Sequence, residues 1–272
     1  MLKQWVEQCL ELSAHPADFY SGARKIIRNV HFSFDGLGNT LEIGDCGFTQ
    51  SKLTALNRLY RVEESIEVAK TLWDRRVGQD KYGSVGFHCY NHLIKNDPDK
   101  KSKRASVMGP CIQSVVLTYN RKETTVDCFY RTTELYKKFP ADLVFLRDNL
   151  LDGFDFSKAP ITRVNFHFAN VTCHPMYFVT LLPLIDYPIL ELNRLKKVDP
   201  YFFTWVVKWT ARYICPEHHR GIAKFAQALR VQMDAKRRIP ADRMSLLVKY
   251  FTDNHPGYKR GYVDPEEEDD AD

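Results

Sequence analysis

The sequence has no run of about 18 consecutive apolar residues, which excludes an ordinary membrane-spanning helix. Its first residues, Met1–Glu7, lack the apolar core of a secretory signal and include an acidic residue. These two absences predict a cytoplasmic protein that has no membrane partner.

Cysteine occurs seven times, but never as a Cys-x-x-Cys pair. An odd number of thiols without paired spacing argues against a disulfide framework and against a structural zinc site. Most of these thiols should therefore be reduced and packed as small apolar residues. No metal site is expected.

Acidic residues are scarce in the body of the chain, because seven of the 34 lie in the last segment, Asp264–Asp272. That segment contains no basic residue and is expected to be disordered, which leaves a formal charge of +12 on the rest. A basic body suits an anionic ligand such as nucleic acid, a nucleotide or a folate with a glutamate tail. Charge alone does not choose among these classes.

Hydrophobic periodicity predicts an α+β fold with a central, largely antiparallel or mixed sheet and flanking helices. Helices are expected over residues 1–28, 53–73, 143–151, 201–213, 221–236 and 244–251. Strands are expected over residues 30–34, 115–119, 125–130 and 163–172, with turns at 35–38 and 120–123. Residues 1–260 should form a single domain that includes a helical extension over residues 195–255, and residues 261–272 the acidic tail.

Four segments contain side chains that could take part in catalysis or ligand binding. Each segment also has an ordinary structural explanation when it is taken alone. They are residues 96–104 (NDPDKKSKR), 109–111 (GPC), 130–142 (YRTTELYKKFPAD) and 165–174 (NFHFANVTCH). Cys111 suits a buried packing position, and the basic run 100–104 suits a solvated loop. The segment Arg131–Glu134 has the pattern of a helix start with a capping box.

The order and spacing of the four segments resemble the thymidylate synthase and deoxycytidylate (dCMP) hydroxymethylase family. In that family an Asn-Asp-Pro-Asp loop is followed by a Pro-Cys pair and then by an Arg-Ser-x-Asp segment that ends in Pro-x-Asn. The matching positions here are Asn96–Asp99, Pro110–Cys111, Arg131–Glu134 and Pro140–Asp142. The resemblance covers residues 70–182 and implies a thymidylate-synthase-like fold.

By this resemblance, Cys111 is the catalytic nucleophile that attacks C6 of a pyrimidine nucleotide. Addition of a thiolate at C6 makes C5 nucleophilic, and nearby cations lower the pKa of a thiol. The resemblance places Arg131 between the thiol and the nucleotide phosphate. Thr132 and either Lys103 or Arg104 complete the implied phosphate site.

Asp142 stands where thymidylate synthases carry the asparagine that reads uracil. Cytosine presents the opposite hydrogen-bonding pattern, and a protonated carboxyl group both accepts from its amino group and donates to N3. The members of the family that modify dCMP carry aspartate here, so dCMP is the favoured substrate. The alternative is that Asp142 is an ordinary helix N-cap before Leu143.

The family's sugar-binding histidine and tyrosine are replaced here by Ala169 and Val171. His167 lies on the same predicted strand and is the candidate substitute in the substrate site. Thr133 is a further candidate contact to the substrate.

The resemblance also implies a cofactor and a second subunit. The carbon donor would be 5,10-methylenetetrahydrofolate, with Glu134 and Trp73 as the candidate cofactor-binding residues. The basic loop 100–104 would cross into the partner's site, which implies a homodimer.

The expected activity is hydroxymethyl transfer to C5 of dCMP. The alternatives are methylation or hydroxymethylation of dUMP or CMP, methylation of dCMP, and an inactive family fold that binds nucleic acid through its basic body. Nucleic acid is the less favoured partner. Members that mark cytosine belong to bacteriophages, so the cytoplasm of a phage-infected cell is a candidate location.

Overall fold

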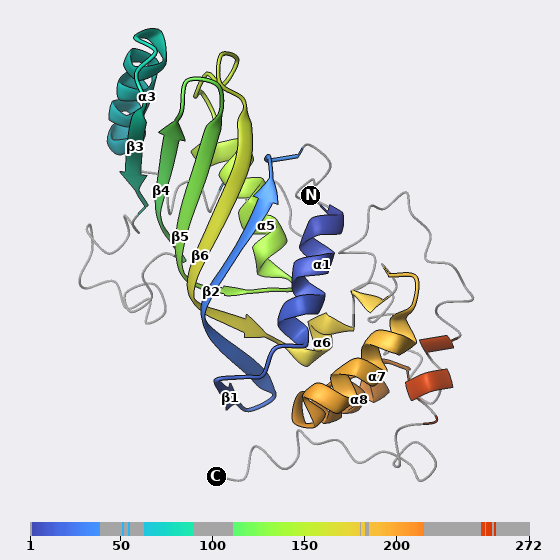
Figure 1. Cartoon of the computed structure of the whole chain (residues 1–272). Helices are drawn as coiled ribbons and strands as arrows, with labels where there is room; N and C mark the ends of the chain where they lie inside the picture. Colours follow the sequence, from blue (N-terminus) through green and yellow to red (C-terminus); the bar gives the residue numbers. More distant parts are fainter. Residues whose placement is uncertain are drawn as a thin grey trace, which may run out of the picture.

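The chain folds as a mixed α+β protein in which a six-stranded sheet is flanked by helices (Figure 1). The computed structural model describes residues 2–38, 51, 54, 63–89, 111–179, 181–182, 185–214, 246–247, 249–251 and 253. Its strands are β1 (Phe19–Ser21), β2 (Arg24–Asp35), β3 (Gly83–His88), β4 (Ile112–Tyr119), β5 (Thr124–Glu134) and β6 (Ile161–Cys173). Its helices are α1 (Leu2–Ser13), α3 (Glu63–Gly78), α5 (Lys138–Phe145), the π-helical turn η1 (Leu146–Leu150), α6 (Pro175–Phe178), α7 (Pro188–Val198) and α8 (Pro200–Ile214).

The strand order is β1-β2-β6-β5-β4-β3, and only the central pair β5–β6 is parallel. A parallel pair needs a crossover connection, which here contains α5 and η1. Figure 1 shows α5 behind the sheet, where it covers one face of the central strands. Residues on α5 are therefore held against the inward-facing side chains of β5.

Aromatic side chains fix α5 to the sheet. Phe139 is fully buried, and its ring centroid lies 5.0 Å from Phe166, 5.2 Å from Phe32 and 5.3 Å from Phe168. Such edge-to-face contacts add to the stabilisation from apolar burial. The position and rotation of α5 are thus set by the core.

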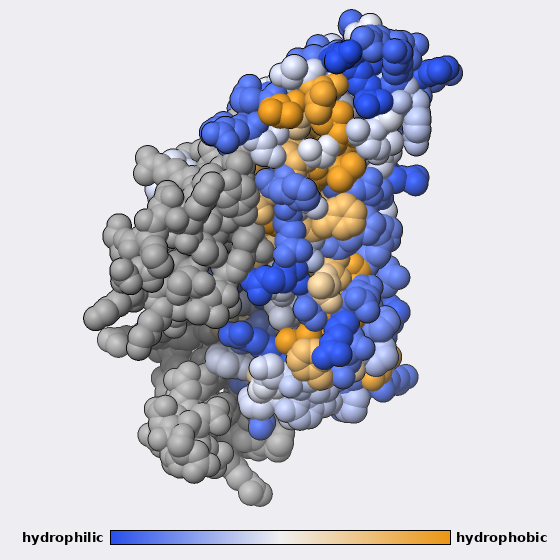
Figure 2. Space-filling view, turned by 90° about the vertical axis from the view of Figure 1, so that its left-hand side faces the viewer, coloured by the Kyte–Doolittle hydropathy of each residue, from blue (hydrophilic) through white to orange (hydrophobic). Residues whose placement is uncertain are grey.

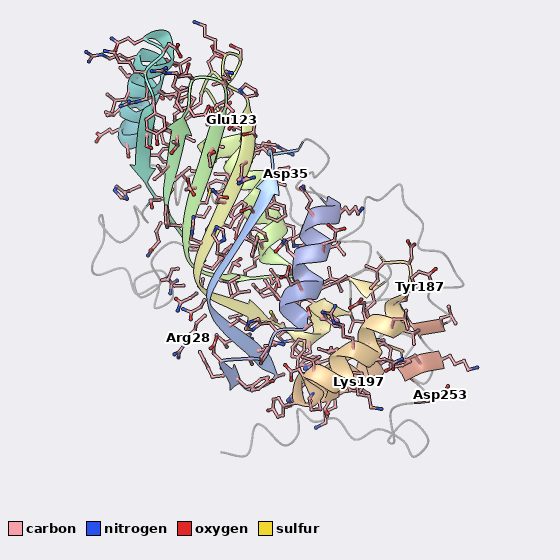
Figure 3. All side chains as sticks on the ribbon, in the orientation of Figure 1. Arg28, Asp35, Glu123, Tyr187, Lys197 and Asp253 are labelled. Atoms are coloured by element: carbon pink, nitrogen blue, oxygen red, sulfur yellow. The ribbon has the colours of Figure 1, made fainter. Side chains whose placement is uncertain are left out.

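The inward-facing alternation shifts by one residue at the same level in three neighbouring strands. At this level, two successive buried residues of a strand are three positions apart in the sequence instead of two. The buried residues of one strand pair with those of the next strand in the sheet. The pairs are Ile27 and Val30 in β2, Val171 and Phe168 in β6, and Thr133 and Tyr130 in β5. Asn29, between the first pair, has a φ of 52°. We call this level the alternation shift; Arg28 lies near it, while Asp35 is at the far end of β2 (Figure 3).

The described strands confirm the predicted pair at 115–119 and 125–130, its turn at 120–123, and the strands at 30–34 and 163–172. The predicted helix 1–28 is wrong beyond Ser13, because β1 pairs with the start of β2 through a turn at Gly22, whose φ is 55°. Strand β3 and helix α7 were not predicted. The predicted helix 221–236 lies outside the described residues.

The predicted helices at 53–73 and 143–151 have shifted boundaries in the structure. The described part of the first runs to Gly78, and the second begins at Lys138. The helix predicted at 201–213 is confirmed by α8.

The two long C-terminal helices are joined to the sheet by a buried ion pair. Lys25 of β2 is fully buried, and its Nζ lies 2.9 Å from Oδ2 of Asp199, which separates α7 from α8. Oδ1 of Asp199 accepts a hydrogen bond from the Tyr20 hydroxyl at 2.6 Å and another from the Phe202 amide. Within the described part of the chain, no helix is long and apolar enough to cross a membrane.

Candidate functional site

Cys111 and Arg131 are neighbours across two antiparallel strands. Cys111 directly precedes β4, and its carbonyl oxygen accepts a hydrogen bond from the Arg131 amide at 2.8 Å. Cys111 is half-buried, whereas the other described cysteines are buried. Those others are Cys9, Cys89, Cys128 and Cys173. Among the described thiols, Cys111 is thus the one with the best access to a ligand.

Asp142 projects from α5 toward the same region. It lies inside the helix, and the N-cap position belongs to Lys137, so the alternative of an Asp142 N-cap is wrong. The carboxylate accepts a hydrogen bond from Thr133 Oγ1 at 3.1 Å. Burial raises the pKa of Asp142 to about 7, against the lowering effects of the Thr133 hydrogen bond and the Lys138 charge.

Electrostatics link Cys111 to the same group of side chains. Burial raises the pKa of the Cys111 thiol, and the Asp142 carboxylate raises it further. The positive charges of Lys138 and Arg131 lower it. We call Cys111, Arg131, Thr133, Lys138 and Asp142 the Cys111 cluster. With a carboxyl group whose pKa is about 7, this cluster can hold or release a proton near neutral pH.

The structure therefore places the backbones of Cys111 and Arg131 side by side and puts Asp142 within electrostatic range of the Cys111 thiol. The sequence motifs had singled out these residues from three different segments. Thr133, a predicted substrate contact, joins them through its bond to Asp142. The alternative of a capped helix start at Arg131–Glu134 is wrong, because these residues belong to β5.

Lys138 was missed by the motif reasoning. Its position four residues before Asp142, in what proves to be one helix, was the available signal, because i and i+4 share a helix face. We expect Lys138→Met to raise the pKa of the Cys111 thiol, because a stabilising positive charge is lost. The rate of iodoacetamide alkylation of Cys111, followed against pH, should then inflect at a higher pH than in the wild type.

Lys137→Met is the matched control for this experiment. Lys137 also starts near α5, but its Nζ lies 3.4 Å from the Tyr177 hydroxyl and over the Tyr177 ring. Its substitution should leave the alkylation profile unchanged. An unchanged profile in Lys138→Met would show that this cation does not act on the thiol.

His167 is not part of the Cys111 cluster. It alternates with the buried Phe166 and Phe168 and so faces the opposite side of the sheet. There its ring stacks on Phe129 at 4.7 Å, and Nε2 lies 3.2 Å from Asp127 Oδ1. The structure does not place His167 where it would replace a sugar-binding residue beside Cys111.

The two candidate cofactor-binding residues are engaged inside the protein. Trp73 is fully buried, and its indole nitrogen donates to the Asp155 carbonyl at 3.0 Å. Glu134 accepts hydrogen bonds from the backbone amides of Lys137 at 2.7 Å and His174 at 3.3 Å. Burial raises the pKa of Glu134 to about 7 in spite of these bonds. In this arrangement the Trp73 side chain is closed off from solvent, whereas the Glu134 side chain is half-buried.

The remaining predicted site residues are only partly described. Thr132 is half-buried and pairs with Asn170 in the ladder beside Arg131. Lys103 and Arg104 lie outside the described residues, as does the segment Asn96–Asp99.

No model of a known protein family matches the chain, and no curated protein sequence matches it. The Cys111 cluster and the motifs that point to it are therefore the features of this chain that bear on its function.

Proposed function

We propose that this protein transfers a one-carbon unit to C5 of a pyrimidine nucleotide, and that the reaction is hydroxymethylation of dCMP. The observation that supports it is the convergence of Cys111, Arg131 and Asp142 in one cluster. These are the residues to which the motifs assign the nucleophile, the phosphate contact and the base contact. The same motifs support a thymidylate-synthase-like arrangement of the mixed sheet.

Four members of the Cys111 cluster have a chemical task in this proposal. Cys111, as the thiolate, adds to C6, and the electron pair moves toward C5 and the N3–C4 side of the ring. Lys138 and Arg131 favour the thiolate, and Arg131 also suits a bidentate contact with a phosphate group. Asp142 accepts from the cytosine amino group and, when protonated, donates to N3.

The proposed donor of the carbon unit is 5,10-methylenetetrahydrofolate. Because Trp73 and Glu134 are engaged elsewhere, the described residues do not identify a folate site. The steps proposed for the protein itself are therefore thiolate addition, base recognition and phosphate binding.

Release of tritium from C5 of labelled dCMP tests this function. Cofactor-dependent release that requires Cys111 is the expected result, because C5 exchanges its hydrogen only after it has become nucleophilic. Mass analysis of the product nucleotide separates a 5-hydroxymethyl from a 5-methyl group. No release from dCMP, dUMP or CMP, together with salt-sensitive binding to nucleic acid, would favour the alternative of an inactive nucleic-acid-binding fold.

The proposal includes a homodimer, and the surface has exposed apolar residues that could form a contact between subunits. The described exposed side chains include the large apolar residues Val68 and Leu72 of α3 and Phe129 of β5. On the side that carries α3 and β3, hydrophobic residues form a broken stripe between hydrophilic ones (Figure 2). Exposed apolar surface of this kind often serves protein–protein contact.

Mixed dimers test whether the basic loop completes the partner's site. Cys111→Ser and Arg104→Ala should each be inactive alone, and their mixture should regain part of the activity after subunit exchange. The reason is that one site of the hybrid then holds both native residues.

The control mixture combines Cys111→Ser with Arg131→Ala. Both residues come from the cluster of a single chain, so each site of that hybrid keeps one defect and no activity should return. A monomer in sedimentation experiments, or no recovery in the first mixture despite confirmed exchange, would contradict the shared site.

A further inference from the structure

The Tyr130 side chain is buried but its hydroxyl group forms no hydrogen bond with any described residue. Tyr130 is 3% exposed and directly precedes Arg131 in β5. Other buried tyrosines are satisfied: the Tyr136 hydroxyl lies 2.7 Å from Ser13 Oγ, and the Tyr119 hydroxyl donates to Asp80 at 2.7 Å. A buried hydroxyl without a partner is unfavourable for folding, so its retention needs an explanation.

The surroundings of Tyr130 hold its ring firmly and place its hydroxyl near the Cys111 cluster. The ring centroid lies 4.8 Å from Phe168 and 5.9 Å from Phe166, both in β6. The alternation shift turns Tyr130 and Thr133 to the same side of β5, the side that α5 covers. The hydroxyl then lies within electrostatic range of the Asp142 carboxyl group and the Cys111 thiol.

Burial also fixes the chemical state of this group. It raises the pKa of Tyr130 well above the ordinary value, and the charges of Asp142 and Cys111 act in the same direction. The phenol therefore stays protonated at neutral pH and offers a neutral O–H donor.

We propose that the Tyr130 hydroxyl is a substrate-binding group, which donates a hydrogen bond to a carbonyl oxygen of the bound pyrimidine base. This inference rests on the proposed function. In the proposed complex Cys111 is bonded to C6 of the pyrimidine and Asp142 contacts N3, and these two ring atoms lie opposite each other. A group near both residues therefore faces one of the two ring edges that run between C6 and N3. Cytosine has its one carbonyl oxygen on such an edge, at C2, where a neutral donor is complementary and a carboxylate is not.

Tyr130→Phe tests the inference, because it removes only the hydroxyl oxygen. The Tm of the ligand-free variant should equal or exceed that of the wild type, since no hydrogen bond within the protein is lost. Binding of dCMP, measured by calorimetry, should weaken by roughly 3- to 10-fold, as expected for one hydrogen bond. The matched control is Tyr136→Phe, which loses the bond to Ser13 and should lower Tm while leaving dCMP affinity unchanged.

The outcomes separate this inference from the proposed function. A lower Tm of ligand-free Tyr130→Phe would show that the hydroxyl is bonded within the protein and would overturn the inference. Equal dCMP affinity in the wild type and Tyr130→Phe would overturn it as well, while the proposed function would stand. If the wild type binds neither dCMP nor dUMP, the proposed function fails and this inference fails with it.

Discussion

Cys111→Ser should still bind dCMP but should lose turnover by several orders of magnitude. Serine keeps the shape of the side chain, but its hydroxyl does not form an accessible anion near neutral pH. The cations that lower the pKa of Cys111 cannot compensate for that difference. Tritium release from C5 gives the turnover, and calorimetry gives the affinity for dCMP.

Cys9→Ala serves as the control for loss of a thiol. Cys9 is fully buried in α1, among residues that take no part in the Cys111 cluster, so its removal should leave turnover largely intact. Near-normal turnover in Cys111→Ser would exclude Cys111 as the nucleophile.

Asp142→Asn should weaken turnover of dCMP more than binding of dCMP, and it should raise activity on dUMP relative to dCMP. Asparagine offers one NH2 donor and one carbonyl acceptor, the pair that reads uracil in the family that the motifs resemble, whereas a carboxyl group with a pKa of about 7 can pair with cytosine. An unpaired buried donor costs about 1–3 kcal/mol, so the preference should move roughly tenfold to a hundredfold. The kcat/KM values of both proteins on both nucleotides measure this change.

Asp127→Asn is a control on the other face of the sheet, where Asp127 contacts Asn165 and His167. It should leave the preference between dCMP and dUMP unchanged. If the wild-type protein already prefers dUMP, or if Asp142→Asn does not alter the preference, the assignment of cytosine fails.

The Asp142→Asn substitution should also change how the stability of the protein depends on pH. The pKa of Asp142 is about 7 in the folded state and 3.8 as the ordinary value, so folding favours the protonated form. The wild-type protein therefore loses stability from this group as pH rises between these values. The Tm of Asp142→Asn relative to wild type should accordingly be higher at about pH 8 than at about pH 5.

Local patterns predicted the central strands because apolar and polar residues alternate along β4 and along β5 and β6 on either side of the alternation shift. The failure between Ser13 and Arg28 has a non-local cause, since β1 is defined by its pairing with β2 and not by its own sequence. The sequence also indicated which face of the sheet His167 occupies, because His167 alternates with the apolar residues Phe166 and Phe168. Which face carries the Cys111 cluster, however, depends on where α5 packs, and that is decided by tertiary contacts.

The alternation shift links three segments that are far apart in the chain, because the same one-residue displacement is present at one level of β2, β5 and β6. If a residue were added or deleted at that level in one of these strands, the side chains beyond it would switch to the opposite face of the sheet. They would then no longer match the inward-facing and outward-facing positions of the other two strands. Tyr130, Arg131 and Thr133 would then no longer face the sides that they face here. Insertions and deletions should consequently be tolerated in the connections of this protein and not at this level of the sheet.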